Sequence, residues 1–360
     1  MSRGPAPRRP PVRGSRGDAR TRRRLMTAYG ALVTLGAALL LLAIAALFIY
    51  LGPGPRAPQG GSTTVVLPSG AGVAEIASDL RRGGVIGSNT AFVVAAEITG
   101  AAHKLKAGEY DFPSRASLHS VITAIAEGRV VRHFVTIPEG VTSQVVMETL
   151  MRADFLTGVV AAPAEGAVLP ETYEVRRGDD RSAVLRRMIE ARDKELAVLW
   201  AHRSPGLPYR SPEDAVTLAS IVEKETAKPD ERPRIASIFI NRLRAGMRLE
   251  SDPTTVYGLT GGRPLGHGLR VSELQSQTPY NTYVIPGLPP TPIANPGRAS
   301  LAAALDPLNT NDLYFVADGT GGHVFSSTLA EHQQNVAKWR AIEAKRSCEA
   351  EAPAGKPAAC

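Results

Sequence analysis

The longest feature in the hydropathy pattern is a single apolar run near the start of the chain. Residues 27–51 contain no charged side chain, and about 20 residues are enough for a helix to cross the hydrocarbon core of a bilayer. A cleaved secretory signal has a shorter apolar segment of about 7–15 residues, followed by a small-residue cleavage site. This run leads instead into the Gly-Pro sequence of residues 52–55. The pattern therefore favours an uncleaved transmembrane helix over residues 26–51, with a cleaved signal peptide as the alternative.

Beyond a linker over residues 52–62, short strand-like and helix-like patterns alternate. The predicted elements are strands over 64–67 and 107–112 and helices over 73–82, 89–98 and 118–126, the second helix being capped by Asn89. The turn sequence at residues 67–70 recurs seventy residues later at 137–140. This weak internal repeat indicates two strand–turn–helix modules, which either form a spacer or grip a carbohydrate.

The second half of the chain has mainly helical periodicity. The predicted elements are helices over 180–202, 211–225, 232–244 and 329–343, with a hairpin that joins residues 314–316 to 323–325. Ser211 is a suitable N-cap, and Pro212 suits the first helical position. Residues 169–175 have the pattern of an exposed junction, and the Pro-rich break at 204–208 is the predicted start of the last domain.

Charge is concentrated in the first 24 residues, which carry nine arginines and one acid, Asp18. The formal net charge of the chain is +8, so this tail accounts for all of it and the remainder is neutral. A basic tail beside an apolar helix stays in the cytoplasm by the positive-inside rule, and a neutral folded part argues against nucleic-acid binding. The two cysteines, Cys348 and Cys360, are too few for a disulfide framework, and the sequence leaves their pairing open.

The helix over residues 211–225 carries the candidate chemistry. At about 100° per residue, Glu223 and Glu225 fall roughly 80° to either side of the apolar stripe through Ala215, while Lys224 faces away. A solvated Glu-Lys-Glu helix end is the alternative interpretation. A carboxylate near a helix C-terminus opposes the macrodipole, and partial burial there raises its pKa toward that of a general acid. Glu225 is slightly favoured because it lies nearer the helix end.

Other polar residues are weaker candidates. Asn241 lies among apolar residues of the next helix, where an Asn more often caps a loop than binds a ligand. The loops after this helix pair contain Tyr257, Tyr280 and Tyr283, whose flat rings suit pyranose sugars, with Asn281 as a hydrogen-bonding neighbour. The same tyrosines also fit a role as ordinary half-buried packing residues.

Motifs for metal-dependent, redox or nucleotide chemistry are missing from the sequence. It contains no HExxH, CxxC, GxSxG or phosphate-loop pattern. His267, His323 and His332 stand singly along the chain. Neither a metal nor a cofactor is therefore predicted.

Six segments together resemble one known family. They are LASIVEKET at 218–226, IASIFINRLRAGMRL at 235–249, SDPTTVYG at 251–258, PYNTYVIPGLPP at 279–290, IANPG at 293–297 and LYFVADGTGGHVF at 313–325. The sequence resembles the YceG-like endolytic murein transglycosylases over about residues 63–345, and most strongly over 204–340. Several long motifs in the same order make this resemblance specific.

The resemblance implies an α+β protein with a single N-terminal transmembrane helix, a LysM-like α/β spacer module and a mainly helical catalytic domain with a β-hairpin. The predicted boundaries are a basic cytoplasmic tail over 1–25, the transmembrane helix over 26–51, a linker over 52–62, the LysM-like module over 63–135, a second strand–helix module with its connecting helix over 136–203, the catalytic domain over 204–345 and a disordered tail over 346–360.

The resemblance also implies cleavage inside peptidoglycan glycan strands, at the β-1,4 bond between MurNAc and GlcNAc, to leave 1,6-anhydro-MurNAc ends. Such a lyase acts in cell wall assembly and glycan strand termination. The family's catalytic glutamate is the one followed by Thr, which falls on Glu225, and Glu223 and Asn241 remain as supporting candidates. Because the sugar's own 6-hydroxyl would attack, a second catalytic carboxylate is not needed.

The expected substrate is the glycan strand, and the expected partners are peptidoglycan synthases. The expected location is the inner (cytoplasmic) membrane, with one membrane pass, a cytoplasmic N-terminus and a periplasmic or otherwise extracytoplasmic catalytic domain. Two alternatives stay open. A muramidase-type hydrolase would need a further carboxylate, for which Glu223, Asp252 and Glu171 are the rivals. A non-catalytic, membrane-tethered scaffold for cell-wall synthases would need none.

Overall fold

The computed structural model describes residues 16–58 and 60–351 of the 360-residue chain, with side chains over 22–58 and 60–346. The predictions for residues 1–15, for 352–360 and for the side chains of Cys348 and Cys360 lie outside these described residues. The chain forms two compact units, Met1–Val131 and Arg132–Cys360. The predicted boundary after residue 135 falls close to this division, while the predicted boundary at 203/204 lies inside the second unit.

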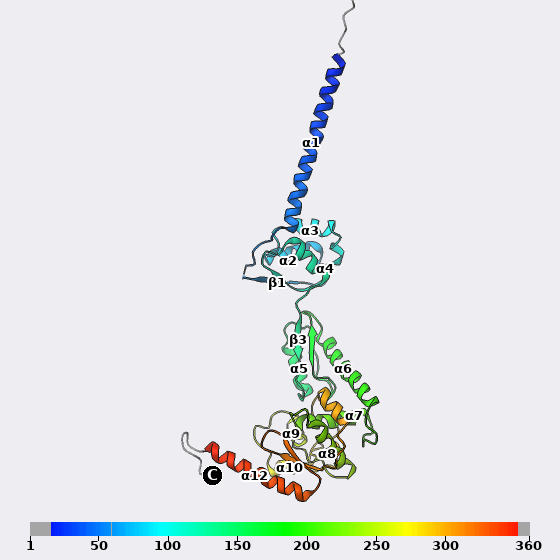
Figure 1. Ribbon diagram of the computed structural model, residues 1–360, viewed down its shortest axis with the longest axis vertical. Helices are drawn as coiled ribbons and strands as arrows, with labels where there is room; N and C mark the ends of the chain where they lie inside the picture. The colour runs from blue at the N-terminus through cyan, green and yellow to red at the C-terminus, as the bar shows by residue number, and fades with distance from the viewer. Residues whose placement is uncertain (1–15, 59, 352–360) are drawn as a thin grey trace, which may run out of the picture. The chain divides into compact units, whose positions relative to one another are not determined.

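Helix α1 (Arg16–Leu51) opens the first unit (Figure 1). Within its segment Arg22–Leu51, an 18-residue window has a mean hydropathy of 2.8, and none of that window is buried against other parts of the protein. By length and composition, this helix can cross a membrane. The predicted apolar helix is therefore present and exposes its side chains, as a lipid-facing helix would.

The rest of the first unit packs helices on a two-stranded sheet. Strand β1 (Ser62–Leu67) pairs antiparallel with β2 (Gly108–Pro113). The helical elements are α2 (Val73–Arg82), α3 (Asn89–Ile98), the 3-10 turn η1 (Ala102–Lys104) and α4 (Leu118–Glu127). Phe92, Tyr110 and Ile125 are fully buried in their common core. The predicted cap of α3 was wrong by one residue, because the Ser88 hydroxyl accepts the Ala91 N–H and Asn89 is already helical.

The second unit begins with the second copy of the repeat. Strand β3 (His133–Thr136), a turn at Gly140 and helix α5 (Ser143–Arg152) repeat the order of β1, its turn and α2. Strand β3 pairs antiparallel with β4 (Thr172–Val175), and α6 (Arg181–Ala201) follows. The prediction of an exposed junction at 169–175 is corrected in part: Glu171, Thr172 and Glu174 are exposed, but residues 172–175 form β4, and Leu169 and Val175 are buried. A four-residue strand flanked by polar residues has too short a pattern to recognise.

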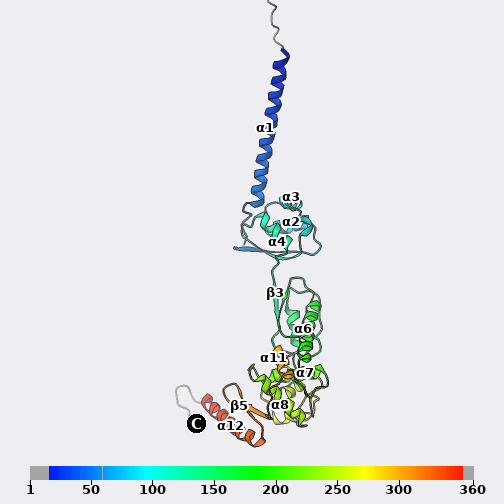
Figure 2. The ribbon, with the colours of Figure 1, turned by 45° about the vertical axis from the view of Figure 1, so that its right-hand side comes forward.

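Helix α7 (Pro212–Glu225) is the centre of the second unit. It packs against α8 (Arg232–Arg244) and α11 (Arg298–Leu305), and all residues from Ala215 to Val222 are buried (Figures 1 and 2). The prediction of one apolar stripe was therefore too narrow, because α7 is covered all round. Its two buried hydroxyls are satisfied locally, since Thr217 and Ser220 donate to the carbonyls of Glu213 and Thr217.

The remaining elements follow α8 and α11. They are α9 (Asp252–Thr260), α10 (Val271–Leu274), the hairpin of β5 (Tyr314–Ala317) and β6 (His323–Ser326), and α12 (Leu329–Glu351). The predicted hairpin is confirmed. The predicted loop at Tyr257 is corrected, because this residue lies on α9, which begins at the Asp-Pro pair after its N-cap Ser251.

The start of α7 has the predicted capping geometry. The Ser211 hydroxyl accepts the Asp214 N–H, the Asp214 carboxylate accepts the Ser211 N–H, and Pro212 occupies the first turn. Such a capping box satisfies donors that a buried helix start would otherwise leave unpaired. The capping box fixes the residue at which α7 begins. Because the helix is fourteen residues long, it ends at Glu225.

Gly166 provides a test of how tightly the second unit is packed. Its φ is +75°, and a Cβ there would lie 2.7 Å from Cγ and 2.8 Å from Cβ of Pro292. Gly166→Ala is therefore expected to lower the free energy of unfolding by roughly 2–4 kcal/mol, from strain and overpacking together. Gly178→Ala is the control, since its φ is +91° but nothing lies within 4 Å; it should cost about 1–2 kcal/mol. Equal losses in chemical denaturation would contradict this account.

Candidate active site

Glu225 is the last residue of α7, and its carboxylate accepts a short hydrogen bond. The Ser251 hydroxyl lies 2.5 Å from Glu225 Oε1. Ser251 is itself buried, and its backbone N–H donates to the Thr282 hydroxyl at 2.9 Å. Thr254 Oγ1 bonds the same hydroxyl at 2.8 Å. The donor to Glu225 is thus fixed by the start of α9 and by the loop at Thr282.

Burial raises the pKa of Glu225 to about 7. Desolvation is the largest cause, and the negative charge of Asp252 raises the pKa further. The Ser251 hydrogen bond and the positive charge of Arg242 act in the opposite direction. At neutral pH the carboxyl group is therefore about half protonated, which is the condition a general acid requires.

Glu223 has a different environment from Glu225, although the helical wheel placed them symmetrically. Its side chain is only 5% exposed, and Oε1 lies 3.0 Å from the Arg232 guanidinium. Its Oε2 accepts the Gly297 N–H at 3.0 Å. Arg232 also contacts Glu139 at 3.3 Å. Glu223 therefore joins the ends of α7, α8 and α11, whereas Glu225 has no ion pair among the described side chains.

The chain after Glu225 is held by a second polar cluster. The Thr226 hydroxyl donates to Glu231 Oε2 at 3.1 Å, and the same oxygen lies 2.7 Å from His323 Nδ1. The Glu231 carboxylate also accepts the His323 N–H at 3.0 Å. These bonds hold the loop that follows the helix against the β5–β6 hairpin. His323 thus has a positional role, and it does not approach Glu225 through any of these contacts.

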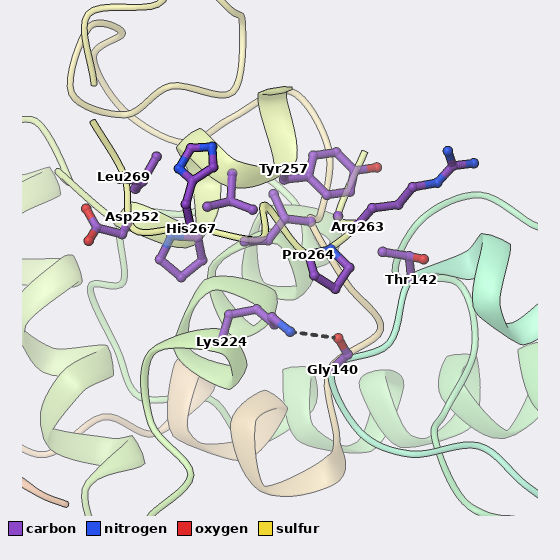
Figure 3. Close-up of a pocket in the computed structure, with 13 residues that line it drawn as sticks. Gly140, Thr142, Lys224, Asp252, Tyr257, Arg263, Pro264, His267 and Leu269 are labelled. Carbon is purple, nitrogen blue, oxygen red and sulfur yellow. Dashed lines mark hydrogen bonds between the residues drawn. The ribbon is translucent and has the colours of Figure 1, made fainter. Parts of the chain in front are cut away.

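A cavity of about 390 Å³ opens beside the C-terminal end of α7 (Figure 3). Its lining consists of Gly140, Thr142, Lys224, Asp252, Pro253, Val256, Tyr257, Gly262, Arg263, Pro264, His267, Leu269 and Ile293. Glu225 is not in the lining, but its sequence neighbour Lys224 is. Asp252, whose negative charge raises the pKa of Glu225, also lines the cavity. The helical wheel predicted that Lys224 faces solvent. Its side chain is exposed, but its Nζ also donates to the Gly140 carbonyl oxygen at 3.3 Å.

Two of the three candidate tyrosines form one aromatic pair at this cavity. The rings of Tyr257 and Tyr280 meet edge to face, with centroids 4.8 Å apart. The Tyr280 hydroxyl bonds Thr291 Oγ1 at 2.8 Å. Tyr283 is not in the lining, but its hydroxyl donates to Oδ1 of the lining residue Asp252 at 2.7 Å. All three tyrosines are partly exposed.

The two candidate asparagines bind the protein itself. Asn281 is fully buried; its carbonyl oxygen accepts from Thr255 and its amide donates to the carbonyls of Leu274 and Ser276. Asn241 donates to the carbonyls of Thr310 and Asp312. In this structure both amides hold loops in place, and neither contacts Glu225.

The profile of the YceG-like family matches residues 65–338. The chain belongs to the YceG-like family. The "Endolytic murein transglycosylase" of Bacillus subtilis (strain 168) is 32% identical to it over 320 residues, which cover 79% of this chain and 86% of that relative. The protein of the same name from Streptococcus pneumoniae (strain ATCC BAA-255 / R6) is 27% identical over 325 residues. That match covers 76% of this chain and 58% of the pneumococcal protein.

A solved crystal structure is also similar to this YceG-like chain. The yceG-like protein from Listeria monocytogenes shares 29% identity with it, covering 76% of this chain and 98% of that one, with a TM-score of 0.47.

Two residues of this candidate site carried no sequence signal that pointed to them. Ser251 lies in the SDPTTVYG segment as an N-cap, which marks a helix start but not the carboxylate it serves. Glu165 lies between α5 and β4 and accepts the Tyr257 hydroxyl at 3.3 Å and the Ser143 N–H at 2.8 Å. Burial raises the pKa of Glu165. It fixes the Tyr257 ring against the second copy of the repeat.

The remaining candidates are placed as follows. Glu171 pairs with Arg298 at 2.9 Å on the surface, away from the Glu225 contacts named above. His267 lines the cavity and lies 3.6 Å from Glu273, while His332 stacks on Tyr314. Among the described residues, no group of three or more His, Cys, Asp or Glu side chains could hold a metal ion.

Glu225→Gln is expected to make unfolding less dependent on pH. The folded-state pKa of about 7 lies above the ordinary value of a glutamate side chain, about 4.3. The wild type therefore loses stability as pH rises from about 5 to about 8, because the folded state must give up a proton that it holds more tightly. Relative to the variant, this loss amounts to at most roughly 3 kcal/mol. Denaturation of the detergent-solubilised full chain at both pH values measures it, and a pH-independent difference would refute the assignment.

Glu223→Gln is expected to destabilise the protein at both pH values, by about 2–4 kcal/mol, because Arg232 would lose its buried partner. Glu213→Gln is the matched control on the same helix, since Glu213 pairs with Arg192 at an exposed position and should cost less than about 1 kcal/mol. Similar losses for the two variants would show that Glu223 does not clamp the fold.

Proposed function

We propose that this YceG-like protein is an endolytic murein transglycosylase, a lyase that cleaves peptidoglycan glycan strands. The observation that carries the proposal is the carboxyl group of Glu225, whose pKa desolvation raises to about 7 beside a cavity. Family membership and the printed names of the relatives support the same reaction class. The bond cut is the β-1,4 linkage from MurNAc to GlcNAc, and the new end is 1,6-anhydro-MurNAc.

In the proposed mechanism Glu225 acts first as acid and then as base. Its protonated carboxyl group gives a proton to the glycosidic oxygen as the bond from C1 to that oxygen breaks. The resulting carboxylate takes the proton of the sugar's 6-hydroxyl as O6 bonds to C1. One bond breaks, one forms, the proton returns to Glu225, and no water is consumed. Because Ser251 donates to Oε1, the transferable proton belongs on Oε2.

The neighbours of Glu225 suit this cycle. Asp252 keeps a negative charge near the reacting centre, which raises the pKa of Glu225 and would favour the positive charge that develops on the sugar ring. Tyr257, Tyr280 and Tyr283 supply ring faces against which pyranose units stack. Asn281 and Asn241 contribute by shaping the loops that carry this cavity and the hairpin.

A muramidase-type hydrolase is the second candidate, and one observation favours it. Asp252 lines the cavity and interacts electrostatically with Glu225, so a water held by Asp252 could attack in place of the 6-hydroxyl. Glu223 and Glu171 are poorer rivals because each is bound to an arginine. A scaffold without catalysis would leave the raised pKa of Glu225 without a use.

The same proposal includes the setting of the reaction. Helix α1 anchors the chain in the inner (cytoplasmic) membrane, with the arginine-rich start in the cytoplasm and the chain beyond residue 51 on the outer side. The β1–α2–α3–β2 unit serves as a LysM-like module on the glycan strand. Peptidoglycan synthases are the proposed partners, since a strand-terminating lyase acts on the strands that they make.

The decisive experiment is digestion of purified glycan strands by the detergent-solubilised full chain, followed by mass spectrometry of the ends. Lyase action gives anhydro ends that are lighter by one water than the reducing ends left by a hydrolase. Glu225→Gln is expected to lower the cleavage rate about 10²–10⁴-fold, which is the usual contribution of a general acid–base group. Glu213→Gln, at the far end of the same helix, should keep wild-type activity. Cleavage by Glu225→Gln at the wild-type rate would remove Glu225 from the mechanism.

The rate of cleavage should also depend on pH. The reaction starts from protonated Glu225, so kcat/KM is expected to fall about tenfold per unit as pH rises beyond about 7. Asp252→Asn removes a negative charge that raises the pKa, so it should shift this fall to lower pH. A profile that stays flat up to about pH 9 would mean that Glu225 does not titrate as the acid.

A further inference from the structure

Helix α3 of the first unit is apolar on its outer face as well as in the core. Phe92 and Ala96 are fully buried, while Val94 is 50% and Ile98 is 81% exposed. The one charged residue of this helix is Glu97. Single exposed apolar residues are common, whereas a contiguous apolar patch marks a surface that contacts another protein, a ligand or a membrane.

This exposed face adjoins the end of α1. A groove of about 550 Å³ is lined on one side by Ala43, Leu47 and other residues of α1, and on the other by Val94 and Ile98 of α3. Its walls are almost entirely apolar. The outer face of α3 is thus continuous with the segment of α1 that is apolar enough to span a membrane.

The end of α1 is fixed to the folded unit, so the height of α3 along α1 is defined. The Tyr50 hydroxyl lies 2.9 Å from His119 Nδ1, and the two rings meet edge to face at 5.2 Å. Beyond Tyr50, the Gly54 N–H donates to the Arg115 carbonyl at 3.2 Å. Tyr50 also packs against the core of this unit. Helix α1 therefore ends as part of the unit and not as a free tether.

Helix length then places α3 at the membrane boundary. At about 1.5 Å per residue, the 30-residue segment Arg22–Leu51 is roughly 45 Å long, whereas the hydrocarbon core is about 30 Å thick. With Arg24 kept at the cytoplasmic face, about 20 residues end the core near Ile44. Residues 43–50 of α1, which line the groove, thus lie at the outer boundary between acyl chains and headgroups.

We propose that α3 lies in this outer boundary, with Val94 and Ile98 inserted among the acyl chains of the lipid that fills the groove. The inference rests on the proposed anchoring by α1. Because Glu97 is the one charged residue of α3, insertion is driven by apolar burial and not by attraction to anionic lipids. The consequence is that the first unit lies on the membrane surface and does not extend away from it.

The test is lipid quenching of a fluorophore on the full chain in nanodiscs that hold one copy each. Cys348 and Cys360 are first replaced by Ser, and a single Cys is then introduced and labelled with a polarity-sensitive dye. Val94→Cys is the test position, and Val66→Cys on β1 is the matched control because its exposure, 49%, equals that of Val94 within one per cent. Leu40→Cys in α1 reports whether the helix spans the bilayer. The lipids carry a nitroxide either near the headgroup or deep in the acyl chain.

The expected result is strong quenching of Val94→Cys by the shallow nitroxide, several-fold more than for Val66→Cys, together with quenching of Leu40→Cys by the deep one. Quenching at Leu40 with neither Val94 nor Val66 affected would overturn the inference while leaving the anchor intact. Equal quenching at Val94 and Val66 would also overturn it, since contact would not be specific to α3. A Leu40 label that no lipid quenches would mean that the anchoring itself fails. Ile98→Cys replaces Val94→Cys if the latter does not fold, and replacing neutral by anionic lipid should leave all values unchanged.

Discussion

The enclosure of α7 is the constraint on which the second unit depends. Eight consecutive residues of this helix, from Ala215 to Val222, are buried, and the helix ends on a carboxylate at the pole where the macrodipole is negative. Desolvation and the dipole both disfavour a charge there. Glu225 can occupy the position because it has one strong donor, Ser251, and because its neutral form is accessible near pH 7. The same burial that makes the helix rigid thus gives the carboxyl group its chemistry.

The nearby Glu223 shows how the protein holds this arrangement together. It bonds Arg232 and the Gly297 N–H, so the ends of three helices meet at one carboxylate. A Cβ at Gly297 would overlap the Glu139 carboxylate, which also contacts Arg232, so any larger residue there would have to displace the Glu139 side chain. Two glutamates that lie two residues apart therefore have different roles. Glu223 is bound to an arginine and links three helix ends, whereas Glu225 forms no ion pair among the described residues.

The repeat gives the two compact units related local structures with different uses. In the first unit, strand, turn and helix build a small core beside α1. In the second unit, the equivalent turn brings Glu139, Gly140 and Thr142 to the end of α7, where they contact Arg232 and line the cavity. Glu165 follows α5 and holds Tyr257. The second copy is thus part of the site in its own unit, while the first copy is built against the long apolar helix α1.

The sequence by itself determined the features that depend on neighbouring residues. The long apolar run, the capping box at Ser211, the helix over 232–244, the hairpin at 314–326 and the presence of two glutamates at one helix end all follow from local patterns. It also carried the family motifs. It could not show that α7 is buried on all sides, that β4 exists, or that Glu223 and Glu225 differ. Those facts depend on contacts between distant residues: 26 positions separate Ser251 from Glu225, 74 separate Gly297 from Glu223, and 92 separate Tyr257 from Glu165. Periodicity records which side of a helix is apolar, but the pKa of a carboxyl group depends on what the folded chain packs around it, and only the tertiary structure decides that.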